Sequence, residues 1–327
     1  MTYLVTGAAG FVGFHVAKRL LEQNIKVVGY DNMNDYYDVV LKNARHAELK
    51  KYENFTFVRA DLVDKIALDN VFAKYSPSVV IHLAAQAGVR YSLENPNAYV
   101  NSNLVGFVNI LECCRHHKVK HLLYASSSSV YGANEKLPFS TSDRVDNPVS
   151  LYAATKKSNE LLAHSYSHNF GLPTTAMRFF TVYGPWGRPD MAPFLFLEAI
   201  EKQQPIKVFN NGNMMRDFTY IDDVVESILA LVECSAAVSN KDDNTQYKVY
   251  NIGNNTPEKL LDFISILEEH TGKTVQKVFL PMQPGDVPST FADISDLIAD
   301  TGVQPKTKLR EGLRRFVNWY KMYNNGR

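Results

Sequence analysis

The segment TGAAGFVG (6–13) separates a short apolar run, YLVT (3–6), from an amphipathic stretch at 11–23. Glycines at positions 7, 10 and 13 permit a tight turn between a strand and a helix, and they let backbone N–H groups approach a pyrophosphate at the helix N-terminus. The spacing is G-x-x-G-x-x-G, which differs from the G-x-G-x-x-G of other dinucleotide-binding folds. A tight connection without a ligand is the alternative, so the surrounding sequence decides between the two.

Short apolar runs and amphipathic segments alternate through the first half of the chain. The runs lie at 3–6, 26–31, 55–61, 78–84 and 121–126, and the amphipathic segments at 11–23, 65–75, 98–117 and 151–169. Nearly continuous apolar strands are typical of a parallel sheet that is covered by helices on both faces. The sequence therefore predicts a doubly wound parallel sheet, a Rossmann-like α/β fold.

The pattern changes after residue 184, where GPWGRPDMAP carries prolines at 185, 189 and 193. Prolines at this density exclude a regular element. We expect a Rossmann domain at 1–184, with returning segments at about 217–235 and 247–253. The smaller α/β substrate lobe then comprises 185–216 and 254–327, so that the two lobes are interleaved.

An acidic residue at the end of the second predicted strand supports dinucleotide binding. Asp31 lies 18 residues past Gly13, where a carboxylate accepts hydrogen bonds from an adenosine ribose and repels a 2′-phosphate, which favours NAD over NADP. Asp61 and Leu62 follow the third strand and suit the adenine edge, although an aspartate that caps the next helix is an equally simple interpretation. We also expect cofactor contacts from Gly7, Gly10, Phe11, Val12, Asn32, Ala84 and Ala85.

Composition excludes several classes of partner. The chain has 327 residues and a formal charge of +1, so no overall field attracts nucleic acid or a membrane surface. Cys113, Cys114 and Cys234 form neither a metal-binding spacing nor an even disulfide set, which is typical of a reducing compartment. That cysteine spacing predicts no metal site. We predict a cytoplasmic protein, because neither a leader pattern nor an apolar run of membrane-spanning length is present.

A tyrosine and a lysine lie four positions apart in YAATK (152–156), on one face of a predicted helix. Such a pair occurs by chance, but this one follows a serine-rich strand end, ASSSSVYG (125–132), where ligands bind in these sheets. The Lys156 ammonium and the positive charge of a nicotinamide favour the phenolate of Tyr152. A pKa drop of roughly three units corresponds to about 4 kcal/mol. Tyr152 then takes a proton from a sugar hydroxyl as hydride leaves the same carbon for NAD.

Together these motifs resemble the extended short-chain dehydrogenase/reductase family over essentially the whole chain. The segments that carry the resemblance are TGAAGFVG, HLAAQAGVR, ASSSSVYG, YAATK, RFFTVYGPWGRPDMA, MRDFTYIDDV and PGDVPSTFAD. They look most like the UDP-glucuronate 4-epimerases of capsule and cell-wall sugar synthesis. The resemblance implies that Ser127 is the catalytic serine, with Tyr152 as base and Lys156 as its partner. It also places Asn103 on a helix packed behind the cofactor site.

The serines beside Ser127 separate this chain from related enzymes. The nucleotide-sugar 4,6-dehydratases resemble T-D-E-V-Y-G at this place, and the UDP-glucuronate decarboxylases resemble T-S-E-V-Y-G. Here Ser128 and Ser129 occupy the acidic positions, so the extra carboxylic acid of either class is missing. The chemistry that remains after oxidation at C4 is return of the hydride to the other face of the sugar.

Individual arginines are expected to bind the substrate. A 4-keto hexuronate is a β-keto acid that loses CO2 readily, so its carboxylate has to be held firmly, and Arg188 with Thr181 beside it is our candidate clamp. The alternative is that Arg188 pairs with Asp190 or orders the proline-rich loop. Arg90 is a second candidate.

Two further substrate contacts come from the resemblance. It matches Arg216 to a pyrophosphate ligand, against a salt bridge with Asp217 as the alternative, and it places Asp286 at the uridine ribose, where a turn aspartate is the alternative. One departure is Gln283, which stands where galactose-type epimerases have an arginine.

The sequence thus favours NAD-dependent C4 epimerisation of UDP-glucuronate to UDP-galacturonate. The resemblance alone implies a homodimer, formed through the helices near 98–117 and 151–169. A neutral UDP-glucose or UDP-N-acetylhexosamine 4-epimerase is the main alternative. A UDP-glucuronate decarboxylase and a non-catalytic NAD-binding protein are further alternatives.

Overall fold

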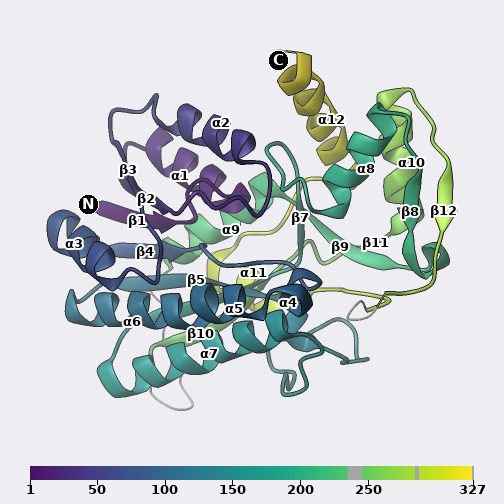
Figure 1. The fold of residues 1–327 in the computed structure, drawn as a ribbon. Coiled ribbons are helices and arrows are strands. Elements are labelled where there is room, and N and C mark those ends of the chain that lie inside the picture. Colours follow the sequence, from purple (N-terminus) through teal and green to yellow (C-terminus); the bar gives the residue numbers. More distant parts are fainter. Residues whose placement is uncertain (235–244, 284–286, 326–327) are drawn as a thin grey trace.

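A seven-stranded parallel sheet forms the frame of the protein (Figure 1). The computed structural model describes residues 1–234, 245–283 and 287–325. The strand order is β10-β6-β5-β4-β1-β2-β3, and every neighbouring pair is parallel. The strands are β1 (Thr2–Thr6), β2 (Lys26–Asp31), β3 (Phe55–Arg59), β4 (Val79–His82), β5 (His121–Ser127), β6 (Thr174–Phe179) and β10 (Tyr247–Ile252). The predicted doubly wound fold is confirmed.

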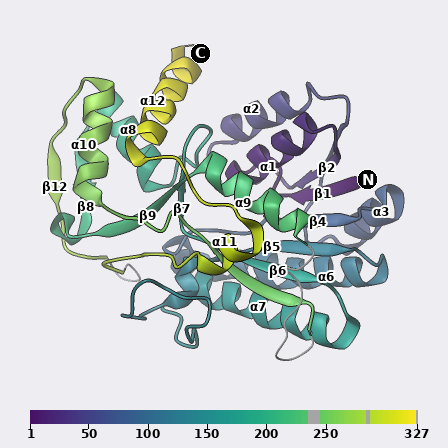
Figure 2. The same cartoon turned by 180° about the vertical axis from the view of Figure 1, so that it is seen from behind.

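Helices cover both faces of this sheet, as Figures 1 and 2 show from opposite sides. One face carries α1 (Phe11–Glu22), α2 (Val39–Leu49) and α9 (Ile221–Glu233). The other carries α3 (Lys65–Tyr75), the π-helix η1 (Val100–Val105), α6 (Gly106–His116) and α7 (Leu151–Phe170), with the short α4 (Tyr91–Glu94) and α5 (Pro96–Tyr99) nearby. Capping residues fix several helix starts, since the side chains of Asp38, Asp64 and Ser150 accept hydrogen bonds from backbone N–H groups of α2, α3 and α7.

The remaining elements gather beyond the carboxyl ends of the main strands. A three-stranded sheet has the order β11-β9-β7, and a two-stranded sheet pairs β12 with β8. The strands of these two small sheets are β7 (Thr181–Tyr183), β8 (Ile206–Val208), β9 (Met215–Tyr220), β11 (Pro257–Lys259) and β12 (Lys277–Phe279). The helices of this group are α8 (Ala192–Glu201), α10 (Leu260–Thr271) and α12 (Leu309–Asn325), and the 3-10 turns are η2 (Ser128–Tyr131) and η3 (Phe209–Gly212). The short α11 (Ser295–Thr301) instead packs against β10 and α9 of the main sheet.

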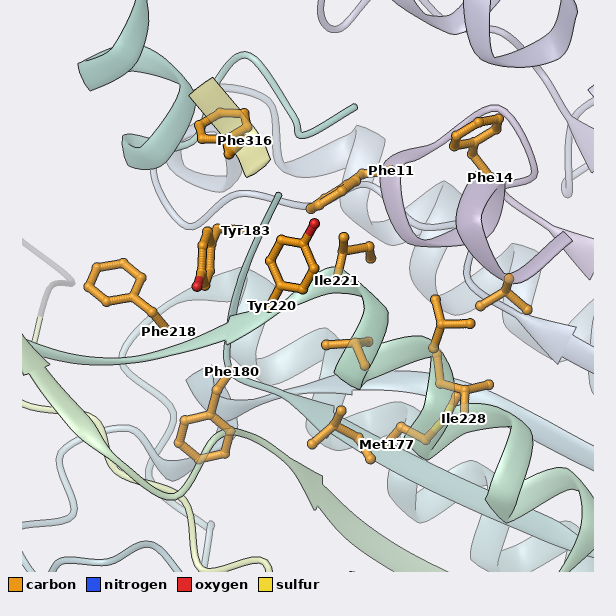
Figure 3. Close-up of a cluster of buried hydrophobic side chains, with 14 of the residues drawn as sticks. Phe11, Phe14, Met177, Phe180, Tyr183, Phe218, Tyr220, Ile221, Ile228 and Phe316 are labelled. Carbon is orange, nitrogen blue, oxygen red and sulfur yellow. The ribbon is translucent and has the colours of Figure 1, made fainter. Parts of the chain in front are cut away.

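A single apolar cluster joins the main sheet to the second group of elements. Figure 3 shows Phe11 of α1 and Ile221 of α9 in the same cluster as Tyr183 of β7 and Phe316 of α12, with Tyr220 between Ile221 and Tyr183. Burial of apolar surface across this boundary ties the two groups together. None of the helices in the described ranges is long and apolar enough to cross a membrane.

Two histidines of this frame, His82 and His121, are buried and His15 is half-buried, and desolvation disfavours the charged form of all three. It lowers the pKa of His15 and His82 to about 3 and that of His121 to about 4. Because these values lie below the unfolded value of about 6.5, the folded state binds fewer protons than the unfolded chain at acid pH. Their full contribution to stability is present above about pH 6.5 and is lost as the pH falls toward the folded pKa.

We expect the wild type to lose stability relative to a His121→Gln variant as the pH falls from about 6.5 to about 4.5. The His121 Nε2 atom lies 2.8 Å from Thr175 Oγ1, and glutamine offers an amide there that does not titrate. The loss should reach up to about 1.4 kcal/mol per pH unit. Urea unfolding at several pH values measures it, with His168→Gln at an exposed position as control. A difference between wild type and His121→Gln that stays constant with pH would contradict the prediction.

Candidate active site

A cavity of about 370 Å³ opens at the carboxyl ends of the main strands, on the side that faces the second group of elements. It is lined by the loops that follow β1, β2, β3, β4 and β5, by the start of α7, and by residues that follow β6. This is where ligands bind in open α/β sheets. Its size is that of a typical small-molecule site.

The glycine turn forms one end of the cavity. Gly7 has a φ of +70°, and a Cβ atom at Gly13 would lie 2.0 Å from the Gly7 carbonyl oxygen. A Cβ at Gly10 would lie 2.9 Å from the same oxygen. Only glycine therefore fits this path, which brings the backbone to the cavity wall at the N-terminus of α1.

Carboxylates lie next to the turn. Asp31 is 8% exposed, and its two oxygens accept hydrogen bonds from the backbone N–H groups of Ala9 (3.1 Å) and Met33 (2.8 Å). Asn32 Nδ2 donates to Asp61 Oδ2 at 2.7 Å. The predicted cofactor residues that line this part of the cavity are Gly7, Gly10, Phe11, Val12, Gly13, Asp31, Asn32, Asp61, Leu62, Ala84 and Ala85.

The predicted catalytic residues meet at the other end. Ser127 ends β5, Tyr152 lies in the first turn of α7, and Lys156 lies one turn later, and all three line the cavity. Lys156 Nζ donates a hydrogen bond of 2.9 Å to the carbonyl oxygen of Ala125. The Ser127 hydroxyl is close enough to the Tyr152 phenol to lower the pKa of that phenol.

The sequence suggests a lowered pKa for Tyr152, but the protein surroundings raise it. Burial raises the pKa of Tyr152 above its ordinary value, while the nearby Ser127 hydroxyl and the positive charge of Arg188 act in the opposite direction. Burial also lowers the pKa of Lys156 to about 8. The protein residues alone therefore leave the phenol protonated at neutral pH, and a phenolate requires further positive charge in the cavity.

The four serines of ASSSSVYG have different surroundings. Ser126 is buried and donates to Glu160 Oε1 at 2.7 Å, and that carboxylate is paired with Arg178. The Ser127 hydroxyl donates to Ser129 Oγ at 3.1 Å and accepts from the Ser129 backbone N–H. All four serines line the cavity, but only Ser126 is hydrogen-bonded to the buried ion pair.

Asn103 lies behind the cavity wall. It is 2% exposed and is not one of the lining residues. Its Oδ1 accepts from the Gln86 backbone N–H at 2.8 Å, and its Nδ2 donates to the Gln86 carbonyl oxygen and to Thr155 Oγ1. It thus fixes the loop after β4 against α7, which agrees with a place behind the cofactor site.

The predicted carboxylate clamp faces the cavity and is also paired. Thr181 and Arg188 both line the cavity. Arg188 Nε lies 3.0 Å from Asp190 Oδ1, and its Nη2 lies 2.5 Å from Asp190 Oδ2. The Tyr36 hydroxyl donates to Asp190 Oδ2 at 3.2 Å. Arg188 can therefore pair with Asp190 and still bind a substrate carboxylate, because an arginine has five N–H donors and this pair uses two.

The other predicted substrate residues lie elsewhere. Arg90 stacks its guanidinium over the Phe209 ring at 5.1 Å, and Arg216 Nη1 donates to the carbonyl oxygens of Met215 and Pro288. Neither arginine is among the lining residues of the cavity. Asp286 lies outside the residues that the structure describes.

The suggested Arg216–Asp217 salt bridge is not among the ion pairs of the described residues. The buried Asp217 carboxylate accepts hydrogen bonds from the backbone N–H groups of Asn254, Asn255 and Ala292.

Several lining residues were not predicted from the sequence, among them Asn34, Tyr36, Tyr37, Lys42, Gln86 and Phe180. Most belong to the loop and helix that follow β2, where no motif or apolar period marks a site. Lys42 Nζ donates to the backbone and side-chain oxygens of Asn34, both at 2.7 Å. The pair of tyrosines in DYYD was the available signal.

Comparison with known proteins agrees with this geometry. The sequence pattern of the NAD dependent epimerase/dehydratase family matches residues 3–253. The chain is 54% identical over 332 residues to Protein CapI of Staphylococcus aureus, covering 99% of each protein. It is 52% identical over 330 residues to a probable UDP-glucuronate 4-epimerase of Rhizobium meliloti strain 1021, covering 98% of this chain and 97% of the relative. A crystal structure of UDP-glucuronic acid 4-epimerase from Bacillus cereus, in complex with UDP-glucuronic acid and NAD, superposes with a TM-score of 0.90 at 36% identity, covering 99% of this chain and 100% of that one.

Proposed function

The chain belongs to the NAD dependent epimerase/dehydratase family, and on that basis we propose that it is an NAD-retaining UDP-glucuronate 4-epimerase that produces UDP-galacturonate. One observation carries the proposal. Ser127, Tyr152, Lys156 and Arg188 line one cavity with the glycine turn, so a nucleotide cofactor, a proton acceptor and a carboxylate ligand can meet there.

The residues around the glycine turn fit NAD. The turn that only glycine permits would hold the pyrophosphate, and Asp31 would accept hydrogen bonds from the adenosine ribose. NAD supplies a hydride acceptor for C4 of the sugar and a donor for its return. Side chains of the protein transfer the proton and orient the sugar.

Tyr152 moves the proton of the reaction. Its phenolate takes the proton from the 4-hydroxyl during oxidation and returns it to the same oxygen afterwards. The Ser127 hydroxyl, which lies beside the phenol, orients the sugar oxygen, and the Lys156 ammonium stabilises the phenolate. The 4-keto sugar rotates about its bond to phosphate before the second half, so that the opposite face is reduced.

The environment limits what the ketone can do. Ser128 and Ser129 offer hydroxyl groups where dehydratases and decarboxylases are expected to carry acids, so the protein provides no carboxyl group there for elimination. Arg188 would hold the C6 carboxylate through the N–H groups that do not face Asp190. A carboxylate that keeps its negative charge in a strong ion pair is a poor source of CO2.

Incubation of the purified protein with UDP-glucuronate and no added NAD tests the proposal. We expect UDP-galacturonate to form, and denatured protein to release NAD. A parallel incubation with UDP-glucose is the control for sugar class. Conversion of the neutral sugar alone would contradict the uronate assignment, and release of a UDP-pentose as the main product would favour a decarboxylase.

We further propose a cytoplasmic homodimer that acts on a soluble UDP-sugar, without nucleic acid or membrane partners. The free thiols of Cys113, Cys114 and Cys234 suit a reducing compartment. Exposed apolar side chains on η1 and α7, such as Val105 and Leu161, support pairing through these helices. We also propose that the two lobes divide at residue 184. The product would be used in capsule and cell-wall sugar synthesis.

A further inference from the structure

The loop between β7 and α8 is anchored by side chains from the opposite part of the protein. Three consecutive carbonyl oxygens in this loop accept hydrogen bonds from helices of the main sheet. His15 Nε2, on α1, donates to Pro185 O at 2.9 Å. Arg45 Nη2, on α2, donates to Trp186 O at 2.6 Å and to Gly187 O at 3.1 Å. The residue that follows these carbonyls is the candidate clamp, Arg188.

Arg45 is the more unusual of the two anchors. It is fully buried, and in the described part of the chain its four hydrogen bonds go to three carbonyl oxygens and the Tyr37 phenol. Its Nε has no hydrogen-bond partner there. A buried guanidinium that is met only by neutral acceptors costs free energy. A role in placing the groups around it accounts for such a residue better than core stability does.

The loop path needs such anchoring. Trp186 has a φ of +61°, in the left-handed region that side chains with a Cβ rarely adopt. Local sequence does not favour that conformation, so contacts from outside the loop have to maintain it. The Arg45 hydrogen bond to the Trp186 carbonyl acts at this residue.

Arg45 also contacts the loop after β2, which carries Tyr36 and Tyr37, and the glycine turn. Its Nη1 donates to the Tyr37 phenol at 2.8 Å and to the carbonyl oxygen of Ala9 in the glycine turn at 2.9 Å. The neighbour of Tyr37, Tyr36, donates to the Asp190 carboxylate that pairs with Arg188. One buried side chain therefore contacts both segments that hold the Arg188–Asp190 pair.

We propose that Arg45 is a positioning residue that fixes the 184–190 loop so that the Arg188 guanidinium faces the substrate carboxylate, and that it thereby keeps this carboxylate on the sugar during the ketone stage. The inference rests on the proposed function. Arginine suits the task because its planar fork bonds on two sides at once, whereas a lysine offers three donors from a single nitrogen.

Misplacement of Arg188 would expose a defined side reaction. In the 4-keto uronate the C5–C6 bond breaks, CO2 leaves, and the electron pair enters an enolate across C5 and C4. A proton from water then adds at C5, which yields a UDP-4-ketopentose. A carboxylate that is held in a strong ion pair resists this loss, so the ratio of CO2 to epimer reports how well Arg188 is placed.

The test compares wild type, Arg45→Lys and Arg45→Met, with Arg19→Met on the exposed side of α1 as matched control. UDP-glucuronate labelled at C6 gives CO2 release and UDP-galacturonate formation in one assay. We expect the ratio of CO2 to epimer to rise by about tenfold or more in Arg45→Lys, since small misplacements near a reacting group have effects of that order. Arg45→Met should show a larger rise, and Arg19→Met none.

Hydrogen exchange of the 184–191 segment provides a readout that does not depend on activity. The Gly187 N–H bonds to Gly184 O and the Met191 N–H bonds to Arg188 O, so a loosened loop should exchange faster in Arg45→Lys, which keeps the cation and most of the stem and is therefore expected to fold. Unchanged exchange, or faster exchange with an unchanged product ratio, would overturn the inference. A wild type that does not convert UDP-glucuronate would instead overturn the proposed function.

Discussion

A Tyr152→Phe variant should bind UDP-glucuronate normally and lose about 10³-fold in kcat, within the range typical for removal of a general base. The phenol is the group that lies with the Ser127 hydroxyl and Lys156 at the end of β5, and phenylalanine keeps its ring contacts while removing the proton acceptor. Product formation measures kcat, and calorimetry measures binding. Unchanged turnover would contradict the mechanism.

The pH profile gives the same prediction a second readout. Burial raises the pKa of Tyr152, so its phenolate becomes more abundant as the pH rises. The pKa of Lys156 is lowered to about 8, so its ammonium persists below that pH and is lost above it. We expect wild-type kcat to rise with pH up to about 8 and then to level off or fall, because the two groups act together. The residual activity of Tyr152→Phe should lack the rising limb.

A matched control separates chemistry from packing. Tyr166 lies on the same helix, α7, and its hydroxyl donates to Glu112 Oε1 at 2.7 Å, away from the cavity lining. A Tyr166→Phe variant removes one hydroxyl from the same element. It should change kcat little, and any loss comparable to that of Tyr152→Phe would show that the helix rather than the phenol was disturbed.

The parts of the site that were predictable from the sequence are those in which neighbouring residues make the structure. The glycine turn depends on Gly7 and Gly13, which are close in the chain, and Tyr152 and Lys156 share a helix face because of their spacing. Asp31 was predictable because it ends a strand whose apolar run is itself a signal. Strand and helix alternation predicted a parallel, doubly wound sheet for the same reason.

Long-range contacts account for what the sequence did not reveal. Arg45 bonds to Ala9, 36 positions away, and to Trp186, 141 positions away, and no local pattern predicts such partners. The helix that carries Arg45, α2, was also missed. Two of its four buried side chains are charged, Lys42 and Arg45, so no apolar stripe marks the face that packs inward. The pairing of β7 with β9 and β11 likewise joins segments that are distant in the chain.

An Arg188→Ala variant should lose roughly 10²- to 10³-fold in kcat/KM for UDP-glucuronate, which corresponds to about 3–4 kcal/mol, as for truncation of one partner of a buried charge pair. Two effects add. The substrate carboxylate loses its ligand, and the Asp190 carboxylate, now without its cation, repels it. Released CO2 should form a larger share of the product, since the ketone stage is no longer protected.

The contribution of repulsion can be separated in a double variant. Arg188→Ala combined with Asp190→Asn removes both charges, so it should bind UDP-glucuronate better than Arg188→Ala alone while remaining weaker than the wild type. Binding of UDP-glucose, measured by calorimetry, should change little in either variant, because that sugar has no carboxylate to attract or repel. Equal losses for both sugars would instead show that Arg188 holds the 184–190 loop and does not read the charge at C6. In that case the half-buried pair with Asp190 would be the whole of its role, and the specificity for a uronate would have to come from another wall of the cavity.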